Sequence, residues 1–306
     1  MTPVTAFCTV NTNAAEFFKI LGIDDRIKCA DTQTISMLST IYEDVKDVGE
    51  YKAPAGDVII NSGCKVLISQ SSSRSLSSAT EQALMDNYGI QTLRLDFYGK
   101  TMLDDVQQLL SIVRSSSAQK AYDSYISEYN MVKKDVLSIS SKVSGDPSFL
   151  MVFTSMKAYY NHNSELGKIV QSVHGHNALD DMGVDPGTGV SNKPDTSIVL
   201  DYDKTTGIDY LFIRSVDSST LKEAYDSFIK NMGGAYDFTK LSPVLNGKTF
   251  VIESDIMSGP RDYIGYVCIA EAFGIDTGYD ALKLVNDFNK KYGFPTYDEI
   301  MIQITA

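Results

Sequence analysis

Apolar residues recur at helical spacing along residues 118–143, in the middle of the chain. These positions are Ala118, Ala121, Tyr122, Tyr125, Ile126, Tyr129, Val132, Val136 and Leu137, and no Gly or Pro interrupts them. A helix of this length would run roughly 39 Å, which is more than a small domain usually needs. The pattern therefore predicts a stiff helix that joins two lobes, with a ligand cleft at their junction.

The first part of the chain alternates apolar runs of strand character with helical patterns. Strands are predicted at residues 4–10, 26–29, 65–69 and 92–95, and helices at 14–21, 34–42, 56–62, 103–113 and in a stretch that ends at Tyr88. Asn11-Thr12-Asn13 is typical of a loop and helix cap, and Gly22, Gly63 and Gly89 are placed to end helices. Because strands separated by helices require crossovers, the sheet should be largely parallel.

The second part repeats this alternation. Strands are predicted at residues 149–153, 209–213 and 249–252, the second introduced by the polar stretch Asp201–Gly207, and helices at 165–173, 221–231, 262–273 and 279–292. The predicted fold class is α/β, with two lobes of mainly parallel sheet joined by one long helix. The expected domains are an N-terminal lobe at 1–114, a linking helix at 115–144 and a C-terminal lobe at 145–306.

Composition narrows the function classes. A chain of 306 residues is long enough for about two domains, each with its own core. The net charge of −12 disfavours nucleic acid or an anionic membrane surface as partner, since such binding needs clustered Lys and Arg. No apolar run reaches the length of about 18 residues that a membrane span needs.

The four cysteines form no C-x-x-C pair, which argues against a zinc ribbon or a thioredoxin-like site. Cys8 and Cys268 lie in apolar settings and are predicted to be buried thiols. The even number permits disulfides without establishing them. A strand is predicted almost directly after Met1, which indicates that the chain carries no signal peptide. The protein is therefore expected to be either cytosolic or a form whose leader has been removed and replaced by Met1.

Ligand loops in parallel sheets lie beyond the carboxyl ends of the strands. Those positions carry Asn11–Asn13, Ser69–Arg74, Phe97–Tyr98, Thr154–Asn163, Arg214 and Ser254–Arg261. Arg74, Arg214 and Arg261 each follow a predicted strand, and an Arg side chain suits carboxylate, catecholate or phosphate groups; an ordinary salt bridge is the equal alternative. Tyrosines near these loops could supply flat walls or a phenolate for ferric iron, or simply pack.

The three histidines, His162, His174 and His176, fall in one stretch of the second half. Imidazole is the commonest transition-metal ligand, but His174-Gly175-His176 has no Cys or carboxylate partner at a standard zinc spacing. A capping or solvated role is therefore favoured. The chain also lacks a nucleophile elbow, a P-loop, an H-E-x-x-H motif and a dinucleotide-binding glycine motif. We expect no enzyme and no cofactor; a cytosolic α/β enzyme with an unrecognised site is the rival hypothesis.

Six segments occur in an order that resembles a known family. They are Val10-Asn11-Thr12-Asn13-Ala14-Ala15-Glu16, Leu21-Gly22-Ile23-Asp24-Asp25-Arg26-Ile27, Val48-Gly49-Glu50-Tyr51, Tyr88-Gly89-Ile90, Val244-Leu245-Asn246-Gly247-Lys248-Thr249-Phe250-Val251 and Gly259-Pro260-Arg261. With the long helix between them, they resemble the helical-backbone, class III substrate-binding proteins of ABC importers, which deliver ferric siderophores, haem and cobalamin. In that family the fifth segment forms a hairpin. The segment Gly175–Asp195, with Gly183, Gly187 and Gly189, is long for the family and is expected to be a flexible insertion.

The resemblance implies an extracytoplasmic, monomeric protein that captures an iron complex (siderophore or haem), or a related metallo-ligand such as cobalamin, and presents it to an ABC permease. A bare zinc or manganese binder of the same architecture would need several His and carboxylates in the cleft, and three His in one half argue against it. Ligand contacts are expected at Asn11, Asn13, Tyr51, Ser72, Arg74, Tyr98, Tyr159, Tyr160, His162, Arg214, Met257 and Arg261.

The family docks onto its permease with one surface carboxylate on each lobe, at the start of a short helix that precedes a strand. Asp57, before the strand at 65–69, and Asp201, before the strand at 209–213, are similar in position. Both residues would also suit helix N-caps, where an Asp accepts hydrogen bonds from free backbone N–H groups. Docking and capping both remain open for Asp57 and Asp201.

Overall fold

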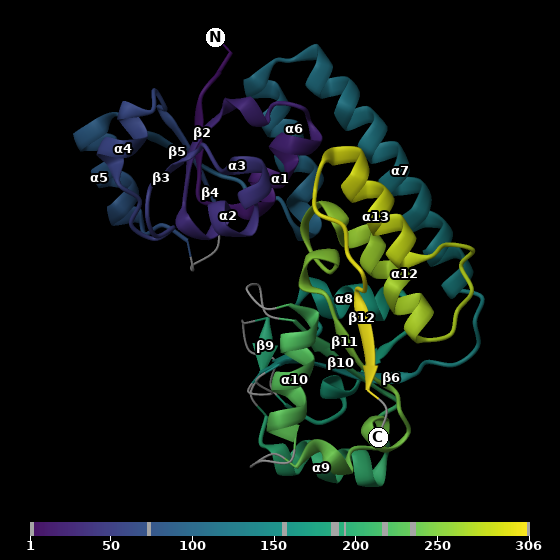
Figure 1. Cartoon of the computed structure of the whole chain (residues 1–306). Coiled ribbons are helices and arrows are strands. Elements are labelled where there is room, and N and C mark those ends of the chain that lie inside the picture. Colours follow the sequence, from purple (N-terminus) through teal and green to yellow (C-terminus); the bar gives the residue numbers. More distant parts are fainter. Residues whose placement is uncertain are drawn as a thin grey trace. The chain divides into compact units, whose positions relative to one another are not determined.

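The computed structural model describes residues 3–71, 75–154, 158–184, 190–192, 194–215, 220–232 and 237–304. The chain divides into two compact units, an N-terminal unit of residues 1–129 and 288–295 and a C-terminal unit of residues 130–287 and 296–306. Two helices, α7 (Ser116–Ser140) and α13 (Ala281–Tyr292), have residues in both units (Figure 1). The domain boundaries drawn from the sequence stay a prediction.

The N-terminal unit holds a five-stranded parallel sheet in the order β3-β2-β1-β4-β5. Its strands are β1 (Phe7–Thr9), β2 (Ile27–Ala30), β3 (Lys46–Asp47), β4 (Val66–Ser69) and β5 (Gln91–Arg94). Its helices are α1 (Thr12–Ile20), α2 (Thr32–Met37), α3 (Ser39–Tyr42), α4 (Gly56–Asn61), α5 (Ser78–Tyr88) and α6 (Met102–Val113), with short 3-10 turns at η1 (Asp24–Arg26) and η2 (Gly99–Thr101). Figure 1 shows α4 and α5 on one side of this sheet and α1 and α6 on the other.

Burial on both faces explains why the central strands β1 and β4 are largely apolar. Cys8 of β1 packs in a core with Ile59 of α4 and Leu84 of α5, whereas its neighbour Phe7 meets Phe18 of α1 edge to face, with ring centroids 5.1 Å apart. Alternate residues of one strand therefore contact helices on opposite faces of the sheet. Gly89 ends α5 at a φ of 67°, a left-handed conformation that glycine adopts without steric cost.

The C-terminal unit holds a seven-stranded mixed sheet with the main order β12-β11-β10-β6-β7-β9. Its parallel centre is β6 (Ser148–Phe153), β10 (Tyr210–Arg214) and β11 (Thr249–Ile252); β8 (His176–Asn177) pairs parallel with β6, and β7 (Tyr159–Tyr160), β9 (Ser191–Asn192) and β12 (Met301–Ile304) pair antiparallel. The helices are α8 (Glu165–Ser172), α9 (Thr196–Thr205), α10 (Leu221–Met232), α11 (Ser242–Leu245) and α12 (Asp262–Ala272), with 3-10 turns at η3 (Ala178–Asp180), η4 (Phe238–Lys240), η5 (Ser254–Ile256) and η6 (Gly259–Arg261).

This sheet is also buried on both faces. One face presents Leu150, Val152, Leu211, Ile213 and Val251 to a core that includes Phe228 of α10. The other face carries an aromatic row in which Phe212 stacks against Phe250 and meets Phe273, at the end of α12, with ring centroids 5.7 Å apart. No helix among the described residues is both long and apolar enough to span a membrane.

The strands and helices predicted from the sequence are present, with ends that shift by a few residues, and the central helix spans Ser116–Ser140. Three expectations are wrong. The helix expected at 34–42 is broken at Leu38 into α2 and α3. The stretch 244–251 is no hairpin, because α11 ends at Leu245 and a turn at Gly247 leads into β11. Asp201, expected at the start of a short helix, lies inside helix α9, which begins at Thr196.

The segment 175–195 contains β8, η3 and β9, so its described part is built into the C-terminal sheet. Gly187 and Gly189, two of the glycines that led us to expect a flexible insertion, lie outside the described residues.

Candidate functional site

The N-terminal sheet changes winding direction between β1 and β4, where ligand crevices form in doubly wound sheets. Asn11 lies two residues after the end of β1, and both ends of its side-chain amide make hydrogen bonds. The side-chain oxygen accepts the N–H groups of Asn13 and Ala14 and so caps α1, while the amide nitrogen donates to the carbonyls of Leu95 (2.9 Å) and Asp96 (3.1 Å). Asn11 therefore ties the loops after β1 and β5 together.

The loop after β4 carries Ser72 and Arg74, which lie outside the described residues. Both ends of that loop are anchored to the neighbouring strand β5. The backbone N–H of Ser71 donates to the Asp96 carboxylate at 2.7 Å, and Arg94 donates to the carbonyls of Gln70 and Leu76. Sequence reasoning missed Arg94 and Asp96, since their contacts depend on the pairing of β4 with β5.

Tyr51 and Tyr98 are both half-buried, in the loops after β3 and β5. The Nζ of Lys52 lies 5.5 Å from the ring centroid of Tyr51. Beside Tyr98, buried Phe97 has a φ of 55°, and its N–H donates to the Asp105 carboxylate at 3.0 Å. Strained backbone of this kind is found more often at functional loops than elsewhere.

In the C-terminal unit, Arg214 marks the carboxyl end of β10, in register with Phe153 of β6 and Ile252 of β11. Its Nε donates to Ser254 Oγ at 2.8 Å, and its Nη1 donates to the Tyr160 hydroxyl at 2.9 Å. The Tyr160 ring stacks on Phe153 with centroids 4.6 Å apart. A half-buried guanidinium is thus held at the strand ends by hydrogen bonds to two other segments, β7 and η5.

A second group of polar side chains follows β11. Arg261 is only 4% exposed, and its Nη2 lies 3.6 Å from the Asp255 carboxylate, which also accepts a hydrogen bond from the Tyr297 hydroxyl at 3.0 Å. Glu253 directly follows β11 and accepts a hydrogen bond from Ser215 Oγ at 3.3 Å. Burial, with the charge of Asp255, raises the pKa of Glu253 to about 7.

Sequence reasoning did not select Glu253, Asp255 or Tyr297. Glu253 carried a usable signal, a carboxylate at the first position after a buried strand. Tyr297 carried none, because it reaches Asp255 from a segment 42 residues further along the chain.

Tyr159 and Met257, two expected ligand residues, have buried side chains. Tyr159 belongs to the core cluster of the C-terminal sheet, with its ring 6.4 Å from that of Phe238. Met257 ends η5 against Gly265 of α12, where an added Cβ would lie 3.1 Å from the Met257 sulfur. The contacts at Tyr159 and Met257 are packing contacts.

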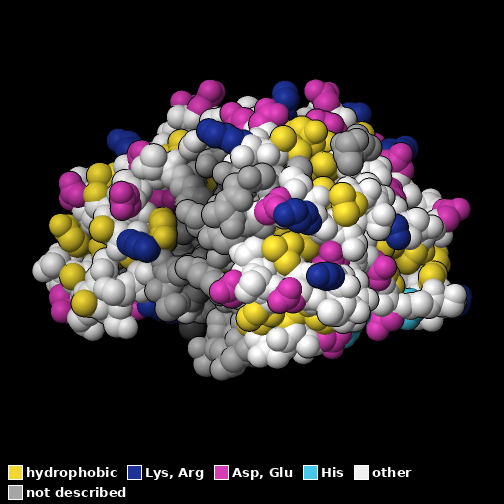
Figure 2. Space-filling model, turned by 90° about the horizontal axis from the view of Figure 1, so that it is seen from below, with side chains coloured by type: hydrophobic (Ala, Val, Ile, Leu, Met, Phe, Trp, Pro, Cys, Tyr) yellow, Lys and Arg dark blue, Asp and Glu magenta, His cyan; other side chains and the backbone are white. Residues whose placement is uncertain are grey.

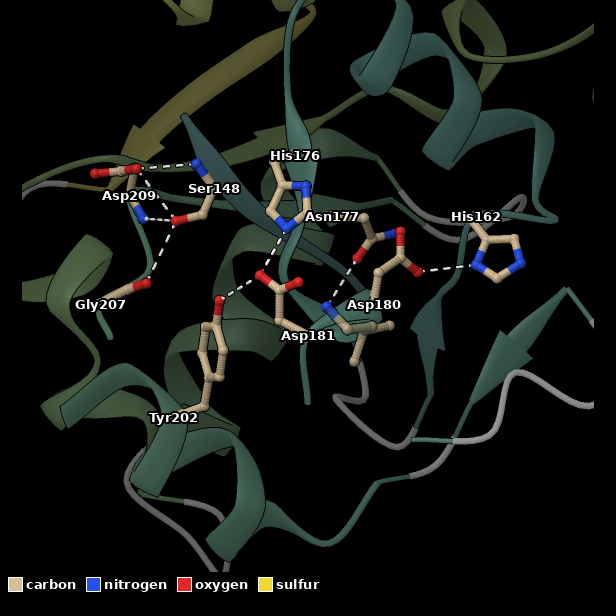
Figure 3. A network of polar contacts seen from close by, with 10 residues as sticks. Ser148, His162, His176, Asn177, Asp180, Asp181, Tyr202, Gly207 and Asp209 are labelled. Carbon is tan, nitrogen blue, oxygen red and sulfur yellow. Dashed lines mark hydrogen bonds and ion pairs between the residues drawn. The ribbon is translucent and has the colours of Figure 1, made fainter. Parts of the chain in front are cut away.

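His162 and His176 pair with carboxylates (Figure 3), and His174 Nε2 lies 2.7 Å from the Val143 carbonyl oxygen. His162 Nδ1 lies 2.8 Å from the Asp180 carboxylate, and His176 Nε2 lies 2.7 Å from that of Asp181. Figure 3 shows His176 and Tyr202 both directed at Asp181, and these two hydrogen bonds lower its pKa. In the part of the chain that the structure describes, no group of three or more His, Cys, Asp or Glu side chains could hold a metal ion.

The two proposed docking carboxylates are both exposed. Asp57 lies in the first turn of α4, whose N-cap position is Ala55. Asp201 lies in the interior of α9, which is capped by Asp195 through the N–H of Ser197 at 2.9 Å, so the expectation that Asp201 begins a helix is wrong. The helix starts earlier because Asp195, directly after Pro194, is a strong cap. Neither Asp57 nor Asp201 occupies an N-cap position.

The described acidic and basic side chains are interspersed on the face shown in Figure 2. The net charge of the chain is −12. A surface of mixed charges differs from the clusters of Lys and Arg with which proteins bind nucleic-acid phosphates.

Neither a protein-family model nor a curated protein matches the sequence. Solved structures do match the fold. The TroA-like periplasmic binding protein FepB from Veillonella parvula is 14% identical with a TM-score of 0.72, and the match covers 99% of this chain and 96% of that one. The molybdate periplasmic binding protein MolA from Haemophilus influenzae is 10% identical with a TM-score of 0.73, covering 97% and 94%.

A periplasmic haem-binding protein from Pseudomonas aeruginosa is 15% identical, with a TM-score of 0.65 and coverage of 88% of this chain and 92% of that one. These likenesses extend over nearly the whole length of both partners. The chain therefore has the fold of the TroA-like periplasmic binding proteins, as the resemblance to class III substrate-binding proteins predicted.

Proposed function

We propose that this chain is the extracytoplasmic substrate-binding protein of an ABC importer and that it captures an anionic iron complex, a siderophore or haem, or a related metallo-ligand such as cobalamin. The observation that carries the proposal is Arg214, a half-buried guanidinium held at the carboxyl end of β10 by Tyr160 and Ser254. A charge fixed in this way is prepared for an anion, since little side-chain entropy is lost on binding.

The fold supports the same function. Proteins of similar structure carry names that state binding of haem and of molybdate. Haem propionates, catecholate siderophores and molybdate share anionic oxygens, which Arg recognises by charge-assisted hydrogen bonds. The chain would act as a monomer and pass its ligand to a membrane permease.

Equilibrium titration of the purified chain tests this proposal. The protein has 18 Tyr and no Trp, so tyrosine fluorescence, supported by calorimetry, can follow binding of ferric siderophores, haem, cobalamin, molybdate, Zn²⁺ and Mn²⁺. We expect saturable binding of one iron complex or of cobalamin. Binding of none of these ligands would contradict the proposal, and binding of Zn²⁺ or Mn²⁺ alone would favour the bare-metal alternative.

Replacing Arg214 with Gln should weaken binding of the ligand identified in that titration by about 1.5–3 kcal/mol, since a charge-assisted hydrogen bond is lost. Affinity should also fall as salt rises, because the interaction is between charges. Arg114→Gln, which makes the same change of charge at an exposed position after α6, is the matched control and should bind normally.

Arg214 also supports the fold through Ser254 and Tyr160, so folding must be measured with affinity. Tyr160→Phe removes one of these hydrogen bonds and keeps the guanidinium; it should lower the melting temperature, and it should weaken ligand binding less than Arg214→Gln does. Unchanged affinity after neutral substitution of Arg74, Arg214 and Arg261 together would exclude an anionic ligand and indicate a neutral or apolar one.

We also propose that Asp57 and Asp201 contact the permease. Because both are exposed and neither lies at an N-cap, changing both to Asn should leave the melting temperature and ligand affinity nearly unchanged. Uptake by the cognate permease in liposomes should fall sharply. Asp195→Ala is the matched control: it removes the true cap of α9, so it should lower the melting temperature without impairing uptake by the folded protein. Normal uptake by the double variant would rule out docking by these residues.

A further inference from the structure

Three of the four cysteines gather in the core of the N-terminal unit, away from the strand-end residues. Cys8 of β1 and Cys29 of β2 are in register on neighbouring strands, and Cys64 lies two residues before β4. All three side chains are fully buried and belong to one core cluster with Ile59 and Leu67. Cys268 lies in the other unit.

Within this cluster, the closest pair is Cys29 and Cys64. Their Sγ atoms are 3.8 Å apart and form a thiol–thiol hydrogen bond. A disulfide requires about 2.05 Å between sulfurs. The remaining separation is under about 2 Å, and closing it requires the two side chains to rotate about their Cα–Cβ bonds.

We propose that Cys29 and Cys64 form a disulfide when the chain folds in an oxidising compartment, leaving Cys8 and Cys268 as thiols. The compartment rests on the proposed extracytoplasmic function; the choice of partners rests on geometry alone. The oxidant is a disulfide compound, either a low-molecular-weight disulfide such as glutathione disulfide or the disulfide of a thiol oxidase.

The reaction is a pair of thiol–disulfide exchanges. One cysteine thiolate attacks the oxidant, forms a mixed disulfide and releases one thiol. The second cysteine thiolate then attacks the protein sulfur of that mixed disulfide, forms the Cys29–Cys64 bond and releases the second thiol. The two protein thiols lose two electrons and two protons, and the oxidant gains them.

The burial of the pair fixes when this reaction can occur. The pKa of Cys29 is raised, because the effects of Cys8 and burial outweigh the lowering effect of the hydrogen bond with Cys64. The pKa of Cys64 is also raised, by its hydrogen bond with Cys29 and by burial. The thiolate is the attacking form, so the folded, reduced protein should react slowly. The bond should therefore form during folding and then resist reduction.

The test is refolding of the whole chain from the reduced, denatured state in a buffer of glutathione and glutathione disulfide. The product is then alkylated in denaturant without reductant and mapped by mass spectrometry. We expect label on Cys8 and Cys268 only, with a crosslinked peptide pair containing Cys29 and Cys64. Label on all four cysteines, or a bond that joins Cys8 to either partner, would overturn the proposal.

Stability gives a second readout. The bond would close the loop of residues 29–64, and the oxidised form should melt about 5 °C or more above the reduced form. Cys64→Ala should abolish this difference, whereas the matched variants Cys8→Ala and Cys268→Ala should keep it. Persistence of the difference in Cys64→Ala would contradict the pairing. Titration with haem and ferric siderophores separates the disulfide proposal from the proposed function. Normal ligand binding by a protein that never forms the disulfide would refute only the disulfide. A protein that forms the disulfide and binds no ligand would refute only the proposed function.

Discussion

Replacing Arg261 with Met should lower the free energy of unfolding at pH 7 by about 3 kcal/mol. Arg261 is 4% exposed and faces the Asp255 carboxylate, which is itself 32% exposed. Removal of one member of a buried ion pair leaves the other charge uncompensated in a poorly solvated place. We take the lower end of the usual range because Asp255 keeps part of its hydration. Urea unfolding of the variant and the original chain measures the difference.

The double variant Arg261→Met with Asp255→Asn identifies the cause. It removes both charges and should recover part of the lost stability, because no uncompensated carboxylate remains at position 255. Tyr297→Phe, which keeps the ion pair and removes one hydrogen bond to Asp255, should cost only about 1 kcal/mol. A double variant as unstable as Arg261→Met alone would mean that lost packing, and not charge, explains the effect.

The fold could be predicted from the sequence wherever local pattern decides structure. Strands such as β6 and β10 are buried on both faces, so they appear as uninterrupted apolar runs between polar loops. The central helix has an apolar stripe long enough to identify. Strands β7, β8 and β9 have two residues each, too short for any periodicity, and only their pairing with the sheet defines them.

Helix α9 was missed although a signal was present. Asp195 is followed by Thr196 and then by Ile198 and Val199, a capping residue before an apolar pair. The polar residues 201–207 indicate only a stretch that introduces a strand, with Asp201 placed at the start of a short helix. That error also misplaced Asp201, since a docking residue at a helix start was inferred from a helix boundary that lies elsewhere.

The candidate site could be predicted only in part, for a similar reason. Arg214 is recognisable because it ends a strand, which is a local property. Its partners Tyr160 and Ser254 are brought to it by the registers of β7 with β6 and of β10 with β6 and β11, which no local pattern encodes. The contact of Arg261 with Asp255 likewise depends on the turns η5 and η6 that bring the two side chains together.

Replacing Glu253 with Gln should stabilise the protein above pH 7, by about 2–3 kcal/mol. The pKa of Glu253 rises from 4.5 to about 7 in the folded state, first because of burial and then because of Asp255, with Arg261 acting in the opposite direction. Between these two pH values the folded chain holds a proton that the unfolded chain has released, so the free energy of unfolding falls as pH rises. The stability is fully present below about pH 4.5 and is lost as pH passes 7.

Gln resembles the protonated carboxyl group and can still accept the hydrogen bond from Ser215. Stability curves from urea unfolding between pH 4 and 8.5 should therefore coincide for the two proteins at the acidic end and separate steadily toward pH 7. Glu299→Gln is the control in the same unit: its side chain is exposed, and the curve should follow that of the original chain throughout. Parallel curves for Glu253→Gln and the original chain between pH 5 and 7 would show that Glu253 is ionised in the folded protein, and that Arg261 outweighs burial and Asp255.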